Sequence, residues 1–170
     1  PNIIDAAHEV GLDRISFMAV DVSSSAFNRP IPWDEPRVQE VALSAAETEE
    51  FSCLVEETIA RYAADFASGF IAESPDKLRR LPKYFAALNG LGEFPETACN
   101  APWVSTVIEA NGDVRPCFFH APLGNIHHQP LGEILNAPAS IEFRRGLDVR
   151  QNPVCKACVC TLQLGRRTPA

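Results

Sequence analysis

Two stretches decide how this chain folds: Cys99-Asn-Ala-Pro-Trp-Val-Ser-Thr-Val-Ile-Glu-Ala-Asn-Gly-Asp-Val-Arg-Pro-Cys117 and Cys155-Lys-Ala-Cys158-Val-Cys160. The first carries a cysteine at each end of a partly alternating apolar run that is interrupted by an Asn-Gly pair, a strong hairpin signal. The second is a short knuckle with two cysteines three positions apart. A hairpin with a thiolate at each foot, closed by such a knuckle, predicts a four-sulfur cage for a metal centre.

The hairpin prediction can be made specific. We expect strands over Val104–Glu109 and Asp113–Cys117. Asn111-Gly112 would form a two-residue type I′ turn, because both central residues of that turn need positive φ. The turn would bring Cys99 and Cys117 to the same end of the hairpin.

Composition bounds the class of protein. The chain has 170 residues, enough for one larger unit and a small unit stapled by metal. A net charge of −7 argues against nucleic acid as a partner, and the pairs Arg144-Arg145 and Arg166-Arg167 are too few to change that. No apolar run approaches the roughly 20 residues of a membrane span.

The chain shows no basic-then-apolar leader, so we expect a cytoplasmic protein. Six cysteines without an export signal then indicate metal ligands rather than a disulfide framework. The sequence begins at Pro1, with a helical pattern that runs straight into a strand pattern. We therefore expect the C-terminal fragment of a longer protein, and a trimmed but complete small protein is the alternative.

Residues 1–92 alternate between helical and strand patterns, which predicts an α/β arrangement with parallel strands and crossover helices. A helix is expected near the start, a second from the capping box Ser44…Glu47 to about Phe66, and a third from Ser74 to Asn89-Gly90. Buried strands are expected at Ile15–Val20 and Phe70–Ala72. Residues 93–170 predict a small cysteine-rich α+β domain, with the hairpin, short helices at Leu131–Leu135 and Ser140–Gly146, and the knuckle.

Thiolates select zinc, copper(I) or iron–sulfur clusters. Four of them fit either tetrahedral zinc or a 4Fe–4S cluster, and spacing alone leaves both open. The first pair, Cys99 and Cys117, is split by a whole hairpin, which favours the wider cage of a cluster.

The neighbouring motifs carry a family resemblance. Cys-x12-Gly-x4-Cys is followed by Pro-Cys-Phe-Phe at 116–119, Leu-Gly-Asn-Ile at 123–126, Leu-Gly-Glu-Ile-Leu-Asn at 131–136 and the final Cys-x2-Cys-x-Cys. Together they resemble the C-terminal extension of radical SAM enzymes, called SPASM when it holds two auxiliary clusters and twitch when it holds one. The preceding strand–helix units resemble the last βα units of the radical SAM partial barrel.

The resemblance implies that Cys99, Cys117, Cys155 and Cys158 bind an auxiliary 4Fe–4S cluster. Only Cys160 follows, so a second complete cluster is not implied and the twitch-like form is preferred; Cys160 could replace Cys158 or stay free. The Cys-x3-Cys-x2-Cys motif of the SAM-cleaving cluster is absent. S-adenosyl-L-methionine and its own 4Fe–4S cluster are therefore expected only in the full-length protein, and this chain alone is expected to be inactive.

The implied function is part of a radical SAM oxidoreductase or of an enzyme that modifies a peptide or small molecule. The auxiliary cluster would transfer an electron or anchor the substrate, and an electron donor is an expected partner. No catalytic residue is assigned. The alternative is a zinc-stabilised structural or interaction domain without redox chemistry.

Several other residues carry weaker expectations. We expect a structural thiol at Cys53, and a partly exposed histidine at His120 with a hydrogen bond to the cluster as the alternative. His127-His128 is expected in a solvated turn. Asp21 ends a buried strand, where ligands gather in parallel α/β folds, although turn aspartates are common without function. Trp33 and Trp103 are expected to pack in the interior, with Trp103 shielding the cluster from water.

Overall fold

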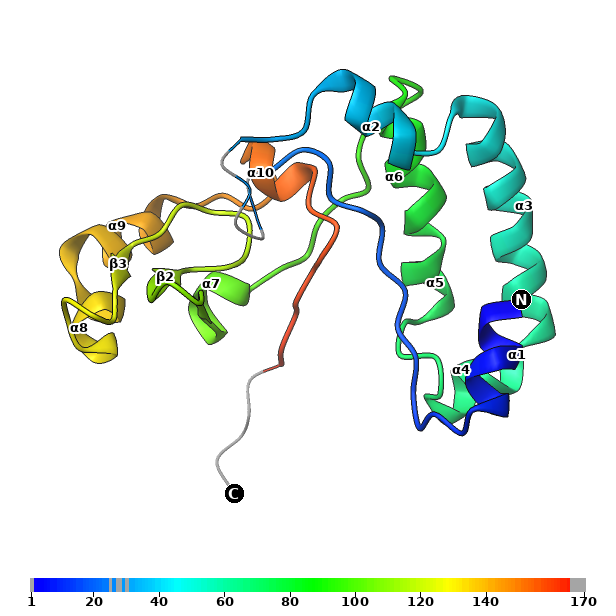
Figure 1. Cartoon of the computed structure of the whole chain (residues 1–170), viewed down its shortest axis with the longest axis horizontal. Helices are drawn as coiled ribbons and strands as arrows, with labels where there is room; N and C mark the ends of the chain where they lie inside the picture. Colours follow the sequence, from blue (N-terminus) through cyan, green and yellow to red (C-terminus); the bar gives the residue numbers. More distant parts are fainter. Residues whose placement is uncertain (1, 25, 27–28, 30, 166–170) are drawn as a thin grey trace. The chain divides into compact units, whose positions relative to one another are not determined.

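The structure, a computed structural model, describes residues 2–24, 26, 29 and 31–165. These residues form two units (Figure 1). The helical unit contains the chain up to Val20 and Asp34–Pro95, and the cysteine unit contains Asp21–Trp33 and the chain from Glu96 onward. Pro1, Pro30 and Arg166-Arg167 lie outside the described residues. Among the described residues, no helix has both the length and the apolar character needed to cross a membrane.

The helical unit consists mainly of helices joined by short connections. They are α1 Asn2–Glu9, α2 Glu35–Val41, α3 Ala45–Arg61, α4 Ala63–Ser68, α5 Pro75–Leu78 and α6 Arg80–Leu88. The predicted capping box is confirmed, since Ser44 and Glu47 each bind the other's backbone amide at the start of α3. Helix α2 was not anticipated, although Asp34 caps it and Pro36 lies in its first turn, both usual signals for a helix start.

Both long helices that the sequence predicts are divided. The first ends at Arg61, and the backbone changes direction at Tyr62, with φ −106° and ψ 31°, before α4 begins. The second is divided between Leu78 and Arg80. Pro82 explains the second break, because proline has no N–H to bond the carbonyl of Leu78, four residues earlier.

The parallel strands are present only as a single bridge. Ile15 pairs with Ile71 in parallel orientation, with hydrogen bonds from the Ile15 amide to the Phe70 carbonyl (2.8 Å) and from the Ala72 amide to the Ile15 carbonyl (2.9 Å). The predicted direction of pairing is confirmed, but the full strands Ile15–Val20 and Phe70–Ala72 are not formed. Parallel sheets are stabilised by several neighbouring strands covered on both faces, and in the described residues these two segments have only each other.

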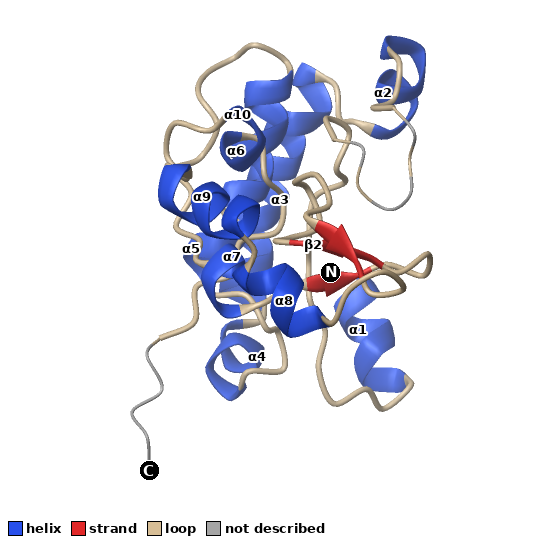
Figure 2. Cartoon of the chain, turned by 90° about the vertical axis from the view of Figure 1, so that its left-hand side faces the viewer, coloured by secondary structure: helices blue, strands red, loops and turns tan. Residues whose placement is uncertain are grey.

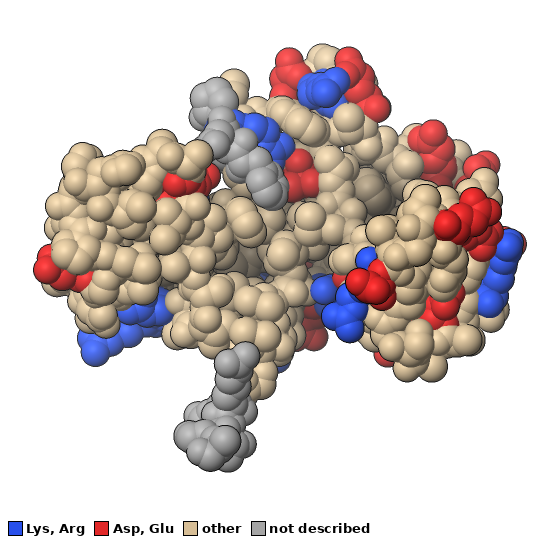
Figure 3. Space-filling model, turned by 60° about the horizontal axis from the view of Figure 1, so that its bottom comes forward, with Lys and Arg blue, Asp and Glu red and all other residues tan. Residues whose placement is uncertain are grey.

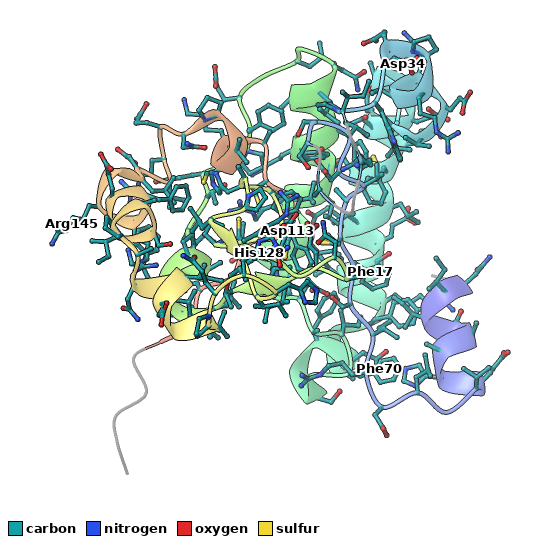
Figure 4. All side chains as sticks on the ribbon, turned by 60° about the vertical axis from the view of Figure 1, so that its left-hand side comes forward. Phe17, Asp34, Phe70, Asp113, His128 and Arg145 are labelled. Atoms are coloured by element: carbon teal, nitrogen blue, oxygen red, sulfur yellow. The ribbon has the colours of Figure 1, made fainter. Side chains whose placement is uncertain are left out.

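The core of the helical unit lies around this bridge. Ile4 of α1, Tyr62 and Ile71 are almost fully buried, and partly buried apolar residues pack against them: Ile15, Phe17, Phe66 and Phe70 (Phe17 and Phe70 are labelled in Figure 4). The Tyr62 hydroxyl donates to Asp5 Oδ1 at 2.6 Å, so its only polar atom is paired. The α3 helix packs against α6.

The cysteine unit contains a three-stranded antiparallel sheet and short helices (Figure 2). Its elements are α7 Ala101–Val104, β1 Val107–Ile108, β2 Asp113–Arg115, β3 Gly124–Asn125, α8 Leu131–Asn136, α9 Pro138–Gly146 and α10 Pro153–Lys156. The hairpin and the two predicted short helices are confirmed. Strand β3 was expected to be loop, and Val104, expected in a strand, ends α7 instead.

The prediction of a two-residue type I′ turn is wrong. The Glu109 amide donates to the Asp113 carbonyl at 2.9 Å, and the Gly112 amide donates to the Glu109 carbonyl at 2.9 Å. The loop between the paired residues therefore has three residues, Ala110-Asn111-Gly112. This is the pattern of a turn followed by a left-handed bulge residue, and Gly112 takes that position with φ +86°. The requirement for glycine therefore remains, at the bulge rather than in the turn centre.

Polar side chains hold this loop in place. Asp113 accepts hydrogen bonds from Asn111 Nδ2 (2.9 Å) and Asn125 Nδ2 (3.0 Å). These bonds, and more weakly the nearby charges of Arg115 and His128, hold the pKa of Asp113 below its ordinary value (Asp113 and His128 are labelled in Figure 4). The side chain of Asn125 thus ties the loop to β3.

A close approach of backbone and side chain defines the small core of this unit. Val114 of β2, Ile134 of α8 and Ser140 of α9 are fully buried. Gly124 lets β3 lie against α8, because a Cβ at this position would stand 2.8 Å from Ile134 Cγ2. The Ser140 hydroxyl donates to the Ile134 carbonyl at 2.6 Å, which joins α8 to α9.

Gly112→Ala tests the bulge. We expect this substitution to lower the free energy of unfolding by at least about 1–2 kcal/mol, because a left-handed conformation is costly for any residue with a Cβ. The added atom would also stand 2.5 Å from His127 Cδ2 and 2.7 Å from Asn125 Oδ1. Gly146→Ala is the matched control, since nothing lies within 4 Å of its added Cβ. Equal urea midpoints for the two variants would contradict this assignment.

Candidate metal centre

Five of the six cysteines line one cavity in the cysteine unit. They come from three places in the chain: Cys99 precedes α7, Cys117 follows β2, and Cys155, Cys158 and Cys160 lie in and after α10. All six cysteines of the chain are free thiols. The hairpin feet and the knuckle therefore border one cavity, which Cys160 also lines, while the four-sulfur cage itself stays a prediction.

The cavity has room for a metal centre. Its volume is about 170 Å³, several times the roughly 30 Å³ share of one water molecule. A single zinc ion requires its thiolates within about 2.3 Å of one point. Among the described residues, no three His, Cys, Asp or Glu side chains gather closely enough to hold one metal ion. The donor set, cysteine sulfur, is one that binds both zinc and iron–sulfur clusters.

The thiols affect one another electrostatically. Burial, and then the neighbouring cysteines, raise the pKa of Cys155 from 9.0 to about 11 and that of Cys158 to about 12. Burial also raises the pKa of Cys117. Without metal these three side chains are neutral thiols at pH 7, and metal binding would have to displace their protons.

Backbone amides point at two of the sulfur atoms. The Ala101 amide donates to Cys99 Sγ at 3.5 Å. The amides of Phe119 and His120 donate to Cys117, which opposes the effect of burial on its pKa. Such donors stabilise thiolate charge, and they arise because the chain turns tightly after each cysteine.

Asn100, the neighbour of Cys99, is bonded to the segment 162–164. The Asn100 amide donates to the Leu162 carbonyl (2.8 Å), its Nδ2 donates to the Leu164 carbonyl (2.8 Å), and its Oδ1 accepts from the Leu164 amide (3.0 Å). Thr161 and Leu162 consequently form part of the cavity wall beside Cys160. Sequence reasoning gave no role to Asn100, because its partners lie more than sixty positions away.

The sequence left the environment of His120 open. Its side chain lines the cavity, is only 8% exposed, and places Nε2 3.4 Å from Cys155 Sγ. Burial lowers its pKa. The expectation of a partly exposed histidine is wrong, and the alternative of a hydrogen bond at the metal centre agrees with this geometry.

The other candidates are not among the residues that line the cavity. Trp103 is 46% exposed and does not line it, so the predicted shielding role is wrong. Cys53 lies on α3 in the helical unit, where its thiol is exposed. His127 and His128 are exposed, as predicted for a solvated turn.

Asp21 has a local structural role. Its buried carboxylate accepts hydrogen bonds from the hydroxyls of Ser23 and Ser24 and pairs with Arg29. Arg29 in turn lies over the Trp33 ring, 4.9 Å from its centroid. These contacts pair the buried Asp21 carboxylate with its neighbours and hold the local turn together.

Comparison with protein families agrees with this geometry. Residues 99–159 match the family model of SPASM, an iron-sulfur cluster-binding domain. The match begins at Cys99, includes Cys117, Cys155 and Cys158, and stops one residue before Cys160. Comparison of the chain with curated proteins and with solved structures gives no match. Residues 99–159 of the cysteine unit are therefore similar to an iron-sulfur cluster-binding domain of the SPASM type, and residues 1–98 lie outside the match.

The raised thiol pKa values predict a pH-dependent stability of the metal-free protein. In the unfolded chain these thiols ionise near pH 9, whereas in the fold Cys155 and Cys158 ionise near 11 and 12. Because the unfolded chain loses these protons at a lower pH than the fold does, the contribution to stability is complete below pH 9. It is lost as the pH rises toward 12. Urea unfolding of the metal-free protein should give a lower free energy of unfolding at pH 10.5 than at pH 8. This decrease should be smaller in the double variant Cys155→Ser/Cys158→Ser than in the wild type. Cys53→Ser is the control, and an equal decrease in all three proteins would contradict the prediction.

Proposed function

We propose that the cysteine unit holds an auxiliary 4Fe–4S cluster and belongs to the C-terminal part of a radical SAM enzyme. The proposed ligands are Cys99, Cys117, Cys155 and Cys158. The observation that carries the proposal is that cysteines from separate segments line one cavity of about 170 Å³. The SPASM match over residues 99–159 supports iron–sulfur as the metal centre.

Cys160 is the fifth thiol of the cavity, and we propose that it is the spare one. The family match ends before it, and its residue is exposed. Its carbonyl accepts a hydrogen bond from Cys158 Sγ at 2.9 Å in the metal-free thiol form. Loss of that proton on metal binding would free Cys158 to bind, with Cys160 able to replace it.

The protein's own part in this function is burial and hydrogen bonding. Apolar residues, among them Val107, Val149 and Leu162, line the wall around the sulfur atoms. The backbone amides at Cys99 and Cys117 stabilise thiolate charge. When bound, the cluster supplies one-electron transfer or a site that anchors substrate, at a potential set by these surroundings.

The proposed context is a radical SAM barrel formed in part by residues 1–92, with the cluster domain in residues 93–170. The parallel bridge between Ile15 and Ile71, with helices in the intervening chain, supports this, because crossover helices join parallel strands. SAM and its own 4Fe–4S cluster would be bound by the N-terminal part of the full-length enzyme.

We propose a peptide or small molecule as substrate and a reduced protein as electron donor. On the face drawn in Figure 3, described acidic and basic side chains lie in small separate groups. Together with a net charge of −7, this supports the exclusion of nucleic acid as a partner. The free thiols support a reducing compartment such as the cytoplasm.

Anaerobic reconstitution with iron and sulfide tests the cluster directly. We expect about four irons per chain and a brown protein with charge-transfer absorption. Cys117→Ser and Cys155→Ser should each lose most of the bound iron, because each removes one ligand of the proposed four. Cys53→Ser, which alters an exposed thiol outside the cavity, should keep all of it. A colourless protein that takes up one zinc and no iron would instead favour the zinc-stabilised structural domain.

If the cluster is auxiliary, the chain by itself should not cleave SAM. Incubated with SAM and dithionite, the reconstituted 170-residue chain should form no 5′-deoxyadenosine. Reductive SAM cleavage needs a cluster with one open iron, and four cysteine ligands leave none. Formation of 5′-deoxyadenosine that requires Cys117 and Cys155 would show that this cluster binds SAM and is not auxiliary. Chromatography of the acid-quenched mixture measures the product.

A further inference from the structure

The His120 imidazole occupies a defined position beside one proposed ligand. Its Nε2 lies 3.4 Å from Cys155 Sγ, within hydrogen-bonding range for sulfur. The imidazole also makes an edge-to-face contact with the Phe143 ring of α9, at a centroid distance of 5.0 Å. At 8% exposure the ring has little freedom to turn toward solvent.

A buried ion pair fixes the loop that carries His120. Arg115 Nη1 donates to the His120 carbonyl at 2.9 Å. The Arg115 side chain is 13% exposed and its Nε lies 2.8 Å from Oε2 of Glu109, which is 9% exposed. These two atoms are not aligned as a hydrogen bond, so their attraction is chiefly Coulombic. Glu109 and Arg115 lie on opposite sides of the hairpin loop, and they connect it to the segment that follows Cys117.

Resting on the proposed function, we propose that His120 donates a hydrogen bond from Nε2–H to the Cys155 thiolate and thereby raises the reduction potential of the cluster. Glu109 and Arg115 act as positioning residues for this donor. A metal-bound thiolate has no proton to give, so Nε2 must carry the hydrogen. Reduction adds negative charge that spreads onto the sulfur ligands, and a donor at one of them stabilises the reduced form more than the oxidised form.

Two substitutions at His120 separate the hydrogen bond from packing. His120→Phe keeps an aromatic ring against Phe143 but has no N–H, whereas His120→Gln keeps an N–H donor of similar reach. After reconstitution, spectroelectrochemical titration should give a more negative midpoint potential for His120→Phe and a value between it and wild type for His120→Gln. Full iron content with an unchanged potential in His120→Phe would overturn the inference and leave the proposed function intact. Wild-type protein that binds no iron would instead overturn the proposed function.

The positioning pair has its own matched control. Arg115→Leu should shift the potential in the same direction as His120→Phe, because the loop loses its anchor. Arg150→Leu removes the same charge from an exposed pair with Glu96 in the same unit, where both side chains are 74% exposed. It should leave the potential unchanged. Equal shifts in the two variants would show a general charge effect and overturn the positioning role.

A measurement on the unaltered protein covers the case in which His120→Phe loses its iron. Pulsed EPR of the reduced, ¹⁵N-histidine-labelled protein should show a nitrogen hyperfine coupling to the cluster. The coupling should disappear in His120→Gln, which contains the other three histidines of the chain, His8, His127 and His128. Absence of the coupling in wild type, or its persistence in His120→Gln, would overturn the inference.

Discussion

Sulfur atoms from distant segments must face one cavity, and the rest of the cysteine unit is arranged around that requirement. The hairpin returns the chain so that Cys117 reaches the cavity that Cys99 also lines, and α10 brings Cys155 to it. Asn100 then binds the chain beyond the knuckle through three hydrogen bonds and closes the wall next to Cys160. A small unit with few fully buried apolar residues depends on such ties, because its core alone buries little surface.

The same arrangement has an electrostatic cost in the absence of metal. Burial and mutual proximity raise the pKa values of Cys117, Cys155 and Cys158, so the cavity disfavours thiolates that nothing neutralises. Iron would reverse this, since it binds the deprotonated form and its positive charge compensates the sulfurs. Amide donors at Cys99 and Cys117 reduce the cost from the protein's side. Binding of a cluster and stability of this unit are therefore coupled.

The hairpin links this electrostatic environment to the fold. Glu109 and Arg115 form a buried ion pair across its loop, and Arg115 continues to the His120 carbonyl. Buried pairs of this kind contribute little net stability, and we propose that this one holds the groups around it in one arrangement. One of these groups is an imidazole against a proposed cluster ligand. The small residues Gly112 and Gly124 allow the loop and β3 to pack closely enough for this arrangement.

The sequence by itself determined the local features whose signals lie within a few residues. These are the caps at Ser44 and Ser74, the existence of the hairpin, the helices after residue 130 and the cysteine pattern of a cluster-binding domain. The tertiary structure decided the rest. The bulged loop is bonded to β3 through Asn125, and His120 lies against Phe143 with its carbonyl bonded to Arg115. Asn100 and Cys160 join the site through contacts between distant segments. Short-range patterns report backbone preference, whereas burial and partner choice depend on which segments meet, and only the folded chain fixes that.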